Sequence, residues 1–145
     1  MSYSINGICQ SIEEFEIQQN SYDFIVAVSS LEHIESHNSF IRKLFEIKDG
    51  LRENGIVCII LNTSISESNA ETNESLEPQF ELNYPTEILQ AFLNEAFCGW
   101  DVLVSSVVAQ EYNIPRATCT SHLDTKVVTY VARNVSTVQT FLSHP

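Results

Sequence analysis

The most constraining feature of this sequence is a strand, helix, strand pattern in its first half. Two short runs, Asp23–Val28 and Ile56–Leu61, are almost entirely apolar and rich in β-branched residues, so both faces of each strand should be buried. Between them, apolar residues recur at helical spacing over Phe40–Ile47, and Gly50 marks the end of the predicted helix. The pattern predicts an α/β fold in which a right-handed crossover joins parallel strands and helices cover both faces of the sheet.

The remaining segments predict three more strands and a second helix. Ser4–Cys9 is expected to form a short strand near the N-terminus. A helix with one apolar face is expected over Pro85–Gly99, with proline at its start and glycine at its end. Trp100–Gln110 and Lys126–Arg133 then follow as strands, and the turn residues between them favour an antiparallel hairpin.

The segment Thr63–Asn83 is expected to be a mobile, acidic loop. It is rich in Ser, Asn, Thr and Glu and has few large apolar residues, so it gains little by ordering its backbone. A solvated loop is the simpler interpretation, and a site for a metal or a cationic partner is the alternative. One domain that contains this loop is predicted over residues 1–135, followed by a C-terminal tail over residues 136–145.

Composition excludes several classes of partner. The chain has 145 residues and a net charge of −12, from 19 acidic and 7 basic side chains, and no basic patch is visible. Such a field repels nucleic acid and anionic lipid. The start of the sequence lacks the pattern of a secretory signal, and no apolar run approaches the ~20 residues of a membrane span, so the expected location is cytoplasmic. The cysteines, which are widely spaced, are expected to be small buried thiols and not part of a disulfide framework or a zinc knuckle: Cys9, Cys58, Cys98 and Cys119.

Polar residues follow the first apolar strand, as expected at a ligand crevice. Ser29 and Ser30 come directly after it, and ligands of open α/β sheets bind outside the carboxyl ends of the strands. His33, near the mouth of this crevice, is a candidate base or substrate-orienting residue, whereas Glu32 is expected to be solvated or to cap a helix. His33 and His37 stand four residues apart, but no third ligand is evident, so no metal site is predicted.

Taken together, these elements resemble the C-terminal half of a class I S-adenosylmethionine-dependent methyltransferase. The resemblance rests on YDFIVAVSSLEHI, FIRKLFEI, the turn LRENG before IVCIILN, and VVTYVARN, and it covers about Ile5 to Asn134. It is strongest to small members of the tellurite-resistance type, which act on small molecules. It implies a partial Rossmann-like sheet, mostly parallel, with an antiparallel C-terminal hairpin and helices on both faces.

The resemblance also implies that part of the cofactor site has no counterpart in this sequence. The match begins at what would be the third strand of the family. The glycine-rich turn and the acidic residue that holds the ribose hydroxyls, which belong to the first two strands, are missing. S-adenosylmethionine is the implied cofactor, yet the chain alone is expected not to bind it usefully.

Five positions match the cofactor site of the family. Ser11 stands where the family has an Asp that accepts from the adenine amino group, and Ile12 stands where an apolar residue packs on the ring. Val28, Ser29 and Ser30 fall at the strand end that lines the methionine and sulfonium part of the cofactor. For these last three, ordinary packing between strand and loop is an equally good interpretation.

Two functions follow from this sequence. The first is a methyltransferase component with a small-molecule acceptor, incomplete and inactive alone. The second is a non-enzymatic remnant that serves as a binding or dimerisation module. Without the first two strands of the family, Asp23–Val28 would be an uncovered sheet edge. Ser4–Cys9, a second copy or a separate N-terminal half could cover it, and self-association is expected for the isolated chain.

Overall fold

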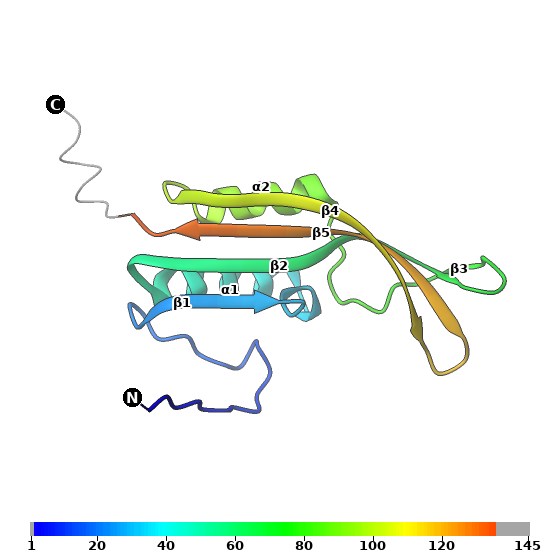
Figure 1. Cartoon of the computed structure of the whole chain (residues 1–145), viewed down its shortest axis with the longest axis horizontal. Coiled ribbons are helices and arrows are strands. Elements are labelled where there is room, and N and C mark those ends of the chain that lie inside the picture. Colours follow the sequence, from blue (N-terminus) through cyan, green and yellow to red (C-terminus); the bar gives the residue numbers. More distant parts are fainter. Residues whose placement is uncertain (1, 136–145) are drawn as a thin grey trace.

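The computed structural model describes residues 2–135, which form a five-stranded sheet and two α-helices (Figure 1). The strand order is β1-β2-β5-β4, and the short β3 pairs with β2. The elements are, in chain order, β1 (Tyr22–Val28), the 3-10 helix η1 (Leu31–His33), α1 (His37–Gly50), β2 (Leu51–Asn69), β3 (Ser75–Leu76), α2 (Thr86–Ala96), β4 (Asp101–Pro115) and β5 (Thr120–Arg133). Neither α-helix of these residues has the length and apolarity needed to cross a bilayer.

The predicted α/β fold is confirmed, including its central crossover and its C-terminal hairpin. β1 and β2 are parallel and are connected through α1, while β4 and β5 form a long antiparallel hairpin. The expectation of a mostly parallel sheet does not hold in detail. Within residues 2–135 the β1–β2 pair is the only parallel one, because β5 inserts antiparallel between β2 and β4.

The helix α1 follows from its sequence as predicted. The hydroxyl of Ser36 accepts a hydrogen bond from the backbone N–H of Ser39 (3.2 Å), which caps the first turn. Phe40, Leu44 and Ile47 then lie on one buried face. Gly50 ends the helix, and a Cβ there would lie only 2.5 Å from a methyl carbon of Ile17, so the close approach of the N-terminal segment requires glycine.

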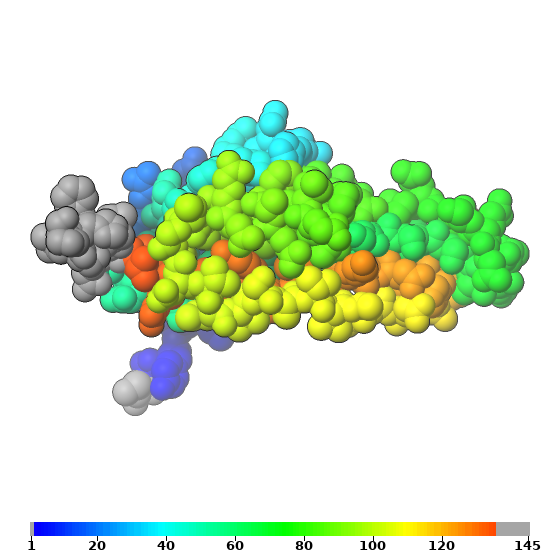
Figure 2. Space-filling view, turned by 90° about the horizontal axis from the view of Figure 1, so that it is seen from above, coloured from blue at the N-terminus to red at the C-terminus, as the bar shows by residue number. Residues whose placement is uncertain are grey.

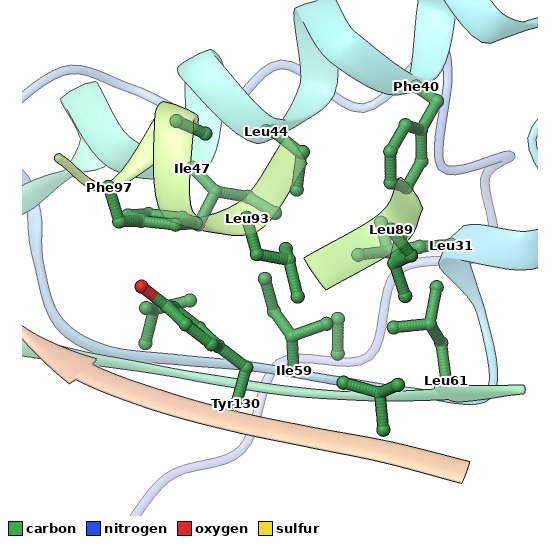
Figure 3. Close-up of a cluster of buried hydrophobic side chains, with 14 of the residues drawn as sticks. Leu31, Phe40, Leu44, Ile47, Ile59, Leu61, Leu89, Leu93, Phe97 and Tyr130 are labelled. Atoms are coloured by element: carbon green, nitrogen blue, oxygen red, sulfur yellow. The ribbon is translucent and has the colours of Figure 1, made fainter. Parts of the chain in front are cut away.

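Both α-helices lie on the same face of the sheet, contrary to the prediction of helices on both faces. Their apolar sides meet the odd-numbered residues of β2 and the even-numbered residues of β5 in one core (Figure 3). Members of this core include Leu31, Phe40, Leu44, Ile47, Val57, Ile59, Leu61, Leu89, Leu93, Phe97, Val128 and Tyr130. Among residues 2–135, no helix lies against the opposite face, as Figures 1 and 2 show from two directions.

The opposite face, called here the uncovered face, is largely apolar. It presents the alternate residues of four strands, and its central row runs from Val26 through Cys58 and Val131 to Val104. On β1, Phe24, Val26 and Val28 are 58%, 52% and 55% exposed. The apolar residues and the cysteine of the uncovered face are Phe24, Val26, Val28, Ile56, Cys58, Ile60, Val104, Val108, Val127 and Val131, and Ser106 and Thr129 lie among them. The strands β1 and β2 are apolar on both faces, but the helices cover only one of these faces.

Two expected segments differ in the structure. Ser4–Cys9 is exposed and forms no strand, because no β-strand lies beside it. The predicted turn before Ile56 is instead an irregularity inside β2, where the register with β1 shifts and Asn54 adopts a left-handed conformation (φ 66°). Here the sequence indicated a turn, and the ladder accommodates the extra residues as a bulge.

The predicted acidic loop, residues 63–83, is wrong for its first third. β2 continues to Asn69 and pairs there with β5 and β3, so these residues are strand. The side chains of Thr63, Ile65 and Glu67 are buried in alternation. The carboxylate of Glu67 accepts two hydrogen bonds from the guanidinium of Arg116, from Nε at 3.0 Å and from Nη2. Glu67 was expected to be a solvated loop residue, but it is a strand residue paired with Arg116. The mobility of residues 70–83 stays a prediction, as does the domain boundary at residue 135.

Candidate cofactor site

A turn at the carboxyl end of β1 creates the candidate site. Ser29 adopts a left-handed conformation (φ 48°), and its backbone N–H donates to the carbonyl of Ile60 on β2 (2.9 Å). The chain then turns away from the sheet into η1. This is the location that the sequence predicts for a ligand crevice, outside the carboxyl ends of parallel strands.

An apolar groove runs along the free edge of β1. Its volume is about 490 Å³, and its walls come from the N-terminal segment, β1 and α1. The N-terminal segment contributes Ile12, Phe15 and Ile17. Lys43 of α1 is the only charged residue in the lining. The groove therefore suits a flat, apolar group more than a phosphate or carboxylate.

The N-terminal wall of the groove is attached to α1 by hydrogen bonds. The ammonium of Lys43 donates to the carbonyl of Phe15 (2.6 Å) and forms an ion pair with Glu46 (3.1 Å). The carboxylate of Glu46 also accepts from the backbone N–H of Ile17 (2.7 Å). Lys43 is thus neutralised within the protein, and its charge is not directed at a ligand.

The structure brings together three of the five predicted cofactor residues. Ile12, Val28 and Ser30 line the groove at the β1 edge. Ser29 lies in a different hollow, about 480 Å³ in volume, on the other side of the strand end. Ser11 lines neither hollow; its hydroxyl accepts from the backbone N–H of Glu14 (3.4 Å) in an exposed turn.

The second hollow lies between the carboxyl end of β1, the middle of β2 and β5, and the second half of β4. Its lining is mixed, with Ile60, Asn62 and Val127 beside Gln110, Glu111 and Tyr112. Glu111 is the only charged residue there. A hollow with a carboxylate and no basic group favours neutral or cationic groups over anions.

His33 lies at the end of η1, close to the crevice but outside the lining of both hollows. Its Nδ1 is 2.9 Å from a carboxylate oxygen of Glu81, and its ring stacks on Phe80 with centroids 5.1 Å apart. The hydrogen bond from His33 is the main cause that lowers the pKa of the Glu81 carboxyl below its usual value of 4.5. With Nδ1–H donating to Glu81, Nε2 of the neutral ring is an acceptor, as a general base requires.

Glu32 is a site residue whose role the sequence did not reveal. It was expected to be solvated, yet it is 1% exposed. Its Oε2 accepts from both the backbone N–H and the side-chain amide of Asn62 at 2.8 Å, and its own carbonyl accepts from the backbone N–H of Leu82 (2.9 Å). Glu32 therefore connects the turn after β1 to the middle of β2.

Comparison with known proteins supports the fold. No protein-family model matches this sequence, and a search of curated proteins finds no match. Solved structures do match. An S-adenosylmethionine-dependent methyltransferase from Methanosarcina mazei is 11% identical over 87% of this chain and 65% of its own, with a TM-score of 0.55. TehB from Haemophilus influenzae is 19% identical over 88% of this chain and 40% of its own, with a TM-score of 0.57.

A third structure agrees with these two. A methyltransferase of the same type from Clostridium acetobutylicum is 14% identical over 89% of this chain and 64% of its own, with a TM-score of 0.55. The chain thus spans between 40% and 65% of the length of these structures. Residues 2–135 have the Rossmann-like fold of S-adenosylmethionine-dependent methyltransferases.

Proposed function

We propose that this chain is the C-terminal part of an S-adenosylmethionine-dependent methyltransferase that acts on a small molecule. The observation that carries the proposal is the apolar groove at the end of β1, where Ile12, Val28 and Ser30 meet. The resemblance assigns these three positions to the cofactor, and the rest of the groove lies along the β1 edge that the first two strands of the family would cover. The tellurite-resistance type is the closest assignment, supported by the likeness in fold to TehB.

The groove fits one side of the cofactor. Ile12 and the apolar wall around it suit an adenine ring, and Val28 and Ser30 lie where the methionine part would approach the strand end. No carboxylate lines the groove to hold the ribose hydroxyls. Ser11, the proposed partner of the adenine amino group, is bonded within its own turn instead. Residues 2–135 thus supply one wall of the site, and the proposal is that the chain is inactive without a second.

The main task of the protein in methyl transfer is to position the acceptor relative to the cofactor. Bound S-adenosylmethionine supplies an activated methyl group, so the protein has to align the acceptor with it and exclude water. The acceptor would occupy the second hollow, beside Ser29 and Asn62. His33 is the candidate base, held by Glu81.

The chain that would supply the second wall of the cofactor site can dock at the edge of the sheet. β1 is at the edge of the sheet, and the uncovered face continues from it across β2, β5 and β4. An apolar edge strand is a template for pairing, and strands that are apolar on both faces are found where both faces are covered. The proposed occupant is a second copy or a separate N-terminal half that carries the glycine-rich turn. A dimerisation module without enzymatic activity is the alternative function.

The cofactor wall can be tested with S-adenosylhomocysteine, the demethylated product. Calorimetry on the isolated chain should detect no binding up to about 1 mM, the weak end of the affinity range. Amide spectra at several millimolar ligand should nevertheless show shifts at Ile12, Val28 and Ser30, and Ile12→Asp should abolish them. Glu35→Ala, an exposed change away from the groove, is the control. A micromolar dissociation constant would show that the site is complete, and shifts confined to other residues would refute the assignment of this wall.

The docking surface can be tested through Val26, which lies at the β1 end of the central row of the uncovered face and is 52% exposed. We expect the chain to dimerise at micromolar concentration and Val26→Lys to weaken the dimer at least tenfold, because a charge would be buried in an apolar interface. Ile88→Lys, at a position on α2 that is similarly exposed (47%), should leave the dimer unchanged. Sedimentation velocity gives both results. A wild-type chain that stays monomeric at high concentration, with the amides of Ile25–Val28 protected from exchange, would eliminate the second copy as occupant.

A further inference from the structure

The outer parts of β4 and β5 carry a cluster of three potential metal ligands. Glu111 on β4 is directly opposite Asp124 on β5. His122 precedes Asp124 by two residues and therefore lies on the same side of β5. One ligand atom from each residue lies within 4.8 Å of the other two. The Nε2 atom of His122 is 3.6 Å from Glu111 Oε1 and 3.9 Å from Asp124 Oδ1.

A neighbouring amide fixes the tautomer of His122. Its Nδ1 is 2.8 Å from the side-chain oxygen of Asn113, the residue directly opposite it on β4. An amide oxygen can only accept, so Nδ1 must carry the hydrogen. In the neutral ring, Nε2 therefore has a lone pair, and this lone pair faces two carboxylate oxygens.

A positive charge stabilises three acceptors that face one another, and either a bound cation or a proton on Nε2 of His122 can supply it. The distances of 3.6 and 3.9 Å exceed those of a direct hydrogen bond. They are close to the spacing of about 3.4 Å between neighbouring ligand atoms around a tetrahedral cation bound at about 2.1 Å. The side chain of His122 is 34% exposed and those of the carboxylates are more so, which leaves room for small adjustments and for water ligands.

We propose that Glu111, His122 and Asp124 bind a divalent first-row transition cation such as Zn²⁺. An imidazole nitrogen in the ligand set favours these metals over Mg²⁺ and Ca²⁺, which prefer oxygen ligands. Asn113 accepts the hydrogen bond from the other ring nitrogen and so orients the imidazole, as hydrogen-bond partners of metal-bound histidines commonly do. Such a cation would join β4 to β5 outside the core that the helices form. The proposal does not rest on the methyltransferase function, although Glu111 also lines the second hollow.

The experiment is titration of the full chain with Zn²⁺, in which calorimetry measures binding and thermal unfolding measures the melting temperature. We expect one ion per chain with a micromolar dissociation constant, a melting temperature that rises with zinc, and no competition from a large excess of Mg²⁺. His122→Gln should weaken binding at least tenfold. His33→Gln is the matched control, because His33 also pairs with a carboxylate but has no third ligand, and it should bind zinc as the wild type does.

A second measurement reads the site directly. In ¹⁵N spectra of the metal-free chain, the neutral His122 ring should carry its hydrogen on Nδ1, and zinc should shift the Nε2 resonance of this residue. Circular dichroism of His122→Gln should match the wild type. Equal zinc affinity in His122→Gln, one-site binding that His33→Gln abolishes, or no binding below 1 mM would each overturn the proposal.

Discussion

Replacing Arg116 with methionine should lower the free energy of unfolding by about 3 kcal/mol, the low end of the cost of breaking a buried ion pair. The carboxylate of Glu67 is 2% exposed and receives both of its protein hydrogen bonds from Arg116. Without the guanidinium it becomes an uncompensated charge inside the β2–β5 pairing. Urea unfolding followed by circular dichroism measures the loss.

The double variant Glu67→Leu with Arg116→Met is the matched control. It removes both charges and leaves apolar groups of similar size, so it should recover most of the stability that the single change loses. A loss below about 1 kcal/mol for Arg116→Met would mean that water reaches Glu67 and that the pair behaves as a surface ion pair.

Replacing Glu32 with alanine should cost roughly 3 kcal/mol of unfolding free energy, because two hydrogen bonds to its side chain are lost and a half-buried backbone N–H is left without a partner. Both bonds come from Asn62, and Glu32 lies at the turn that forms the candidate crevice. Denaturant unfolding measures the change. The amide of Asn62 should also exchange faster with solvent.

Glu35→Ala provides the comparison for Glu32. Glu35 lies three residues away and is exposed, so its removal should change stability by no more than about 0.5 kcal/mol. Glu32→Gln keeps an acceptor for Asn62 and should fall between the two. Equal stabilities of Glu32→Ala and Glu35→Ala would show that the buried contact contributes nothing to the fold.

Hydrophobic patterns predicted the elements that bury apolar faces. The runs in β1 and β2, the helical spacing in α1 and the alternation in β5 each depend on the apolar residues that form the core. The same reasoning failed where polar groups are buried by specific partners. Thr63 and Glu67 are polar in sequence, yet Thr63 donates to the carbonyl of Lys126 and Glu67 pairs with Arg116. Partners so distant in sequence cannot be identified from local composition.

The candidate site was predicted in position but not in its details. Ser29 and Ser30 follow a buried strand, and this alone located the crevice. The separation of Ser29 from Ile12 and Ser30 depends on the left-handed turn at Ser29, which no local pattern required. The approach of Glu111 to His122 depends on the register of β4 with β5. That register is set by the whole hairpin, so periodicity within one strand does not reveal it.

The position of β5 between β2 and β4 has a consequence for synthesis on the ribosome. Ile59 pairs with Tyr130, which comes far later in the sequence, so the central ladder of the sheet cannot form until both strands have left the ribosome. Until then β1, α1 and β2 emerge with an unpaired strand and exposed apolar groups. Long-range pairing of this kind slows folding and favours aggregation of the nascent chain. Production of this protein should therefore depend strongly on chaperones and on slow translation at low temperature.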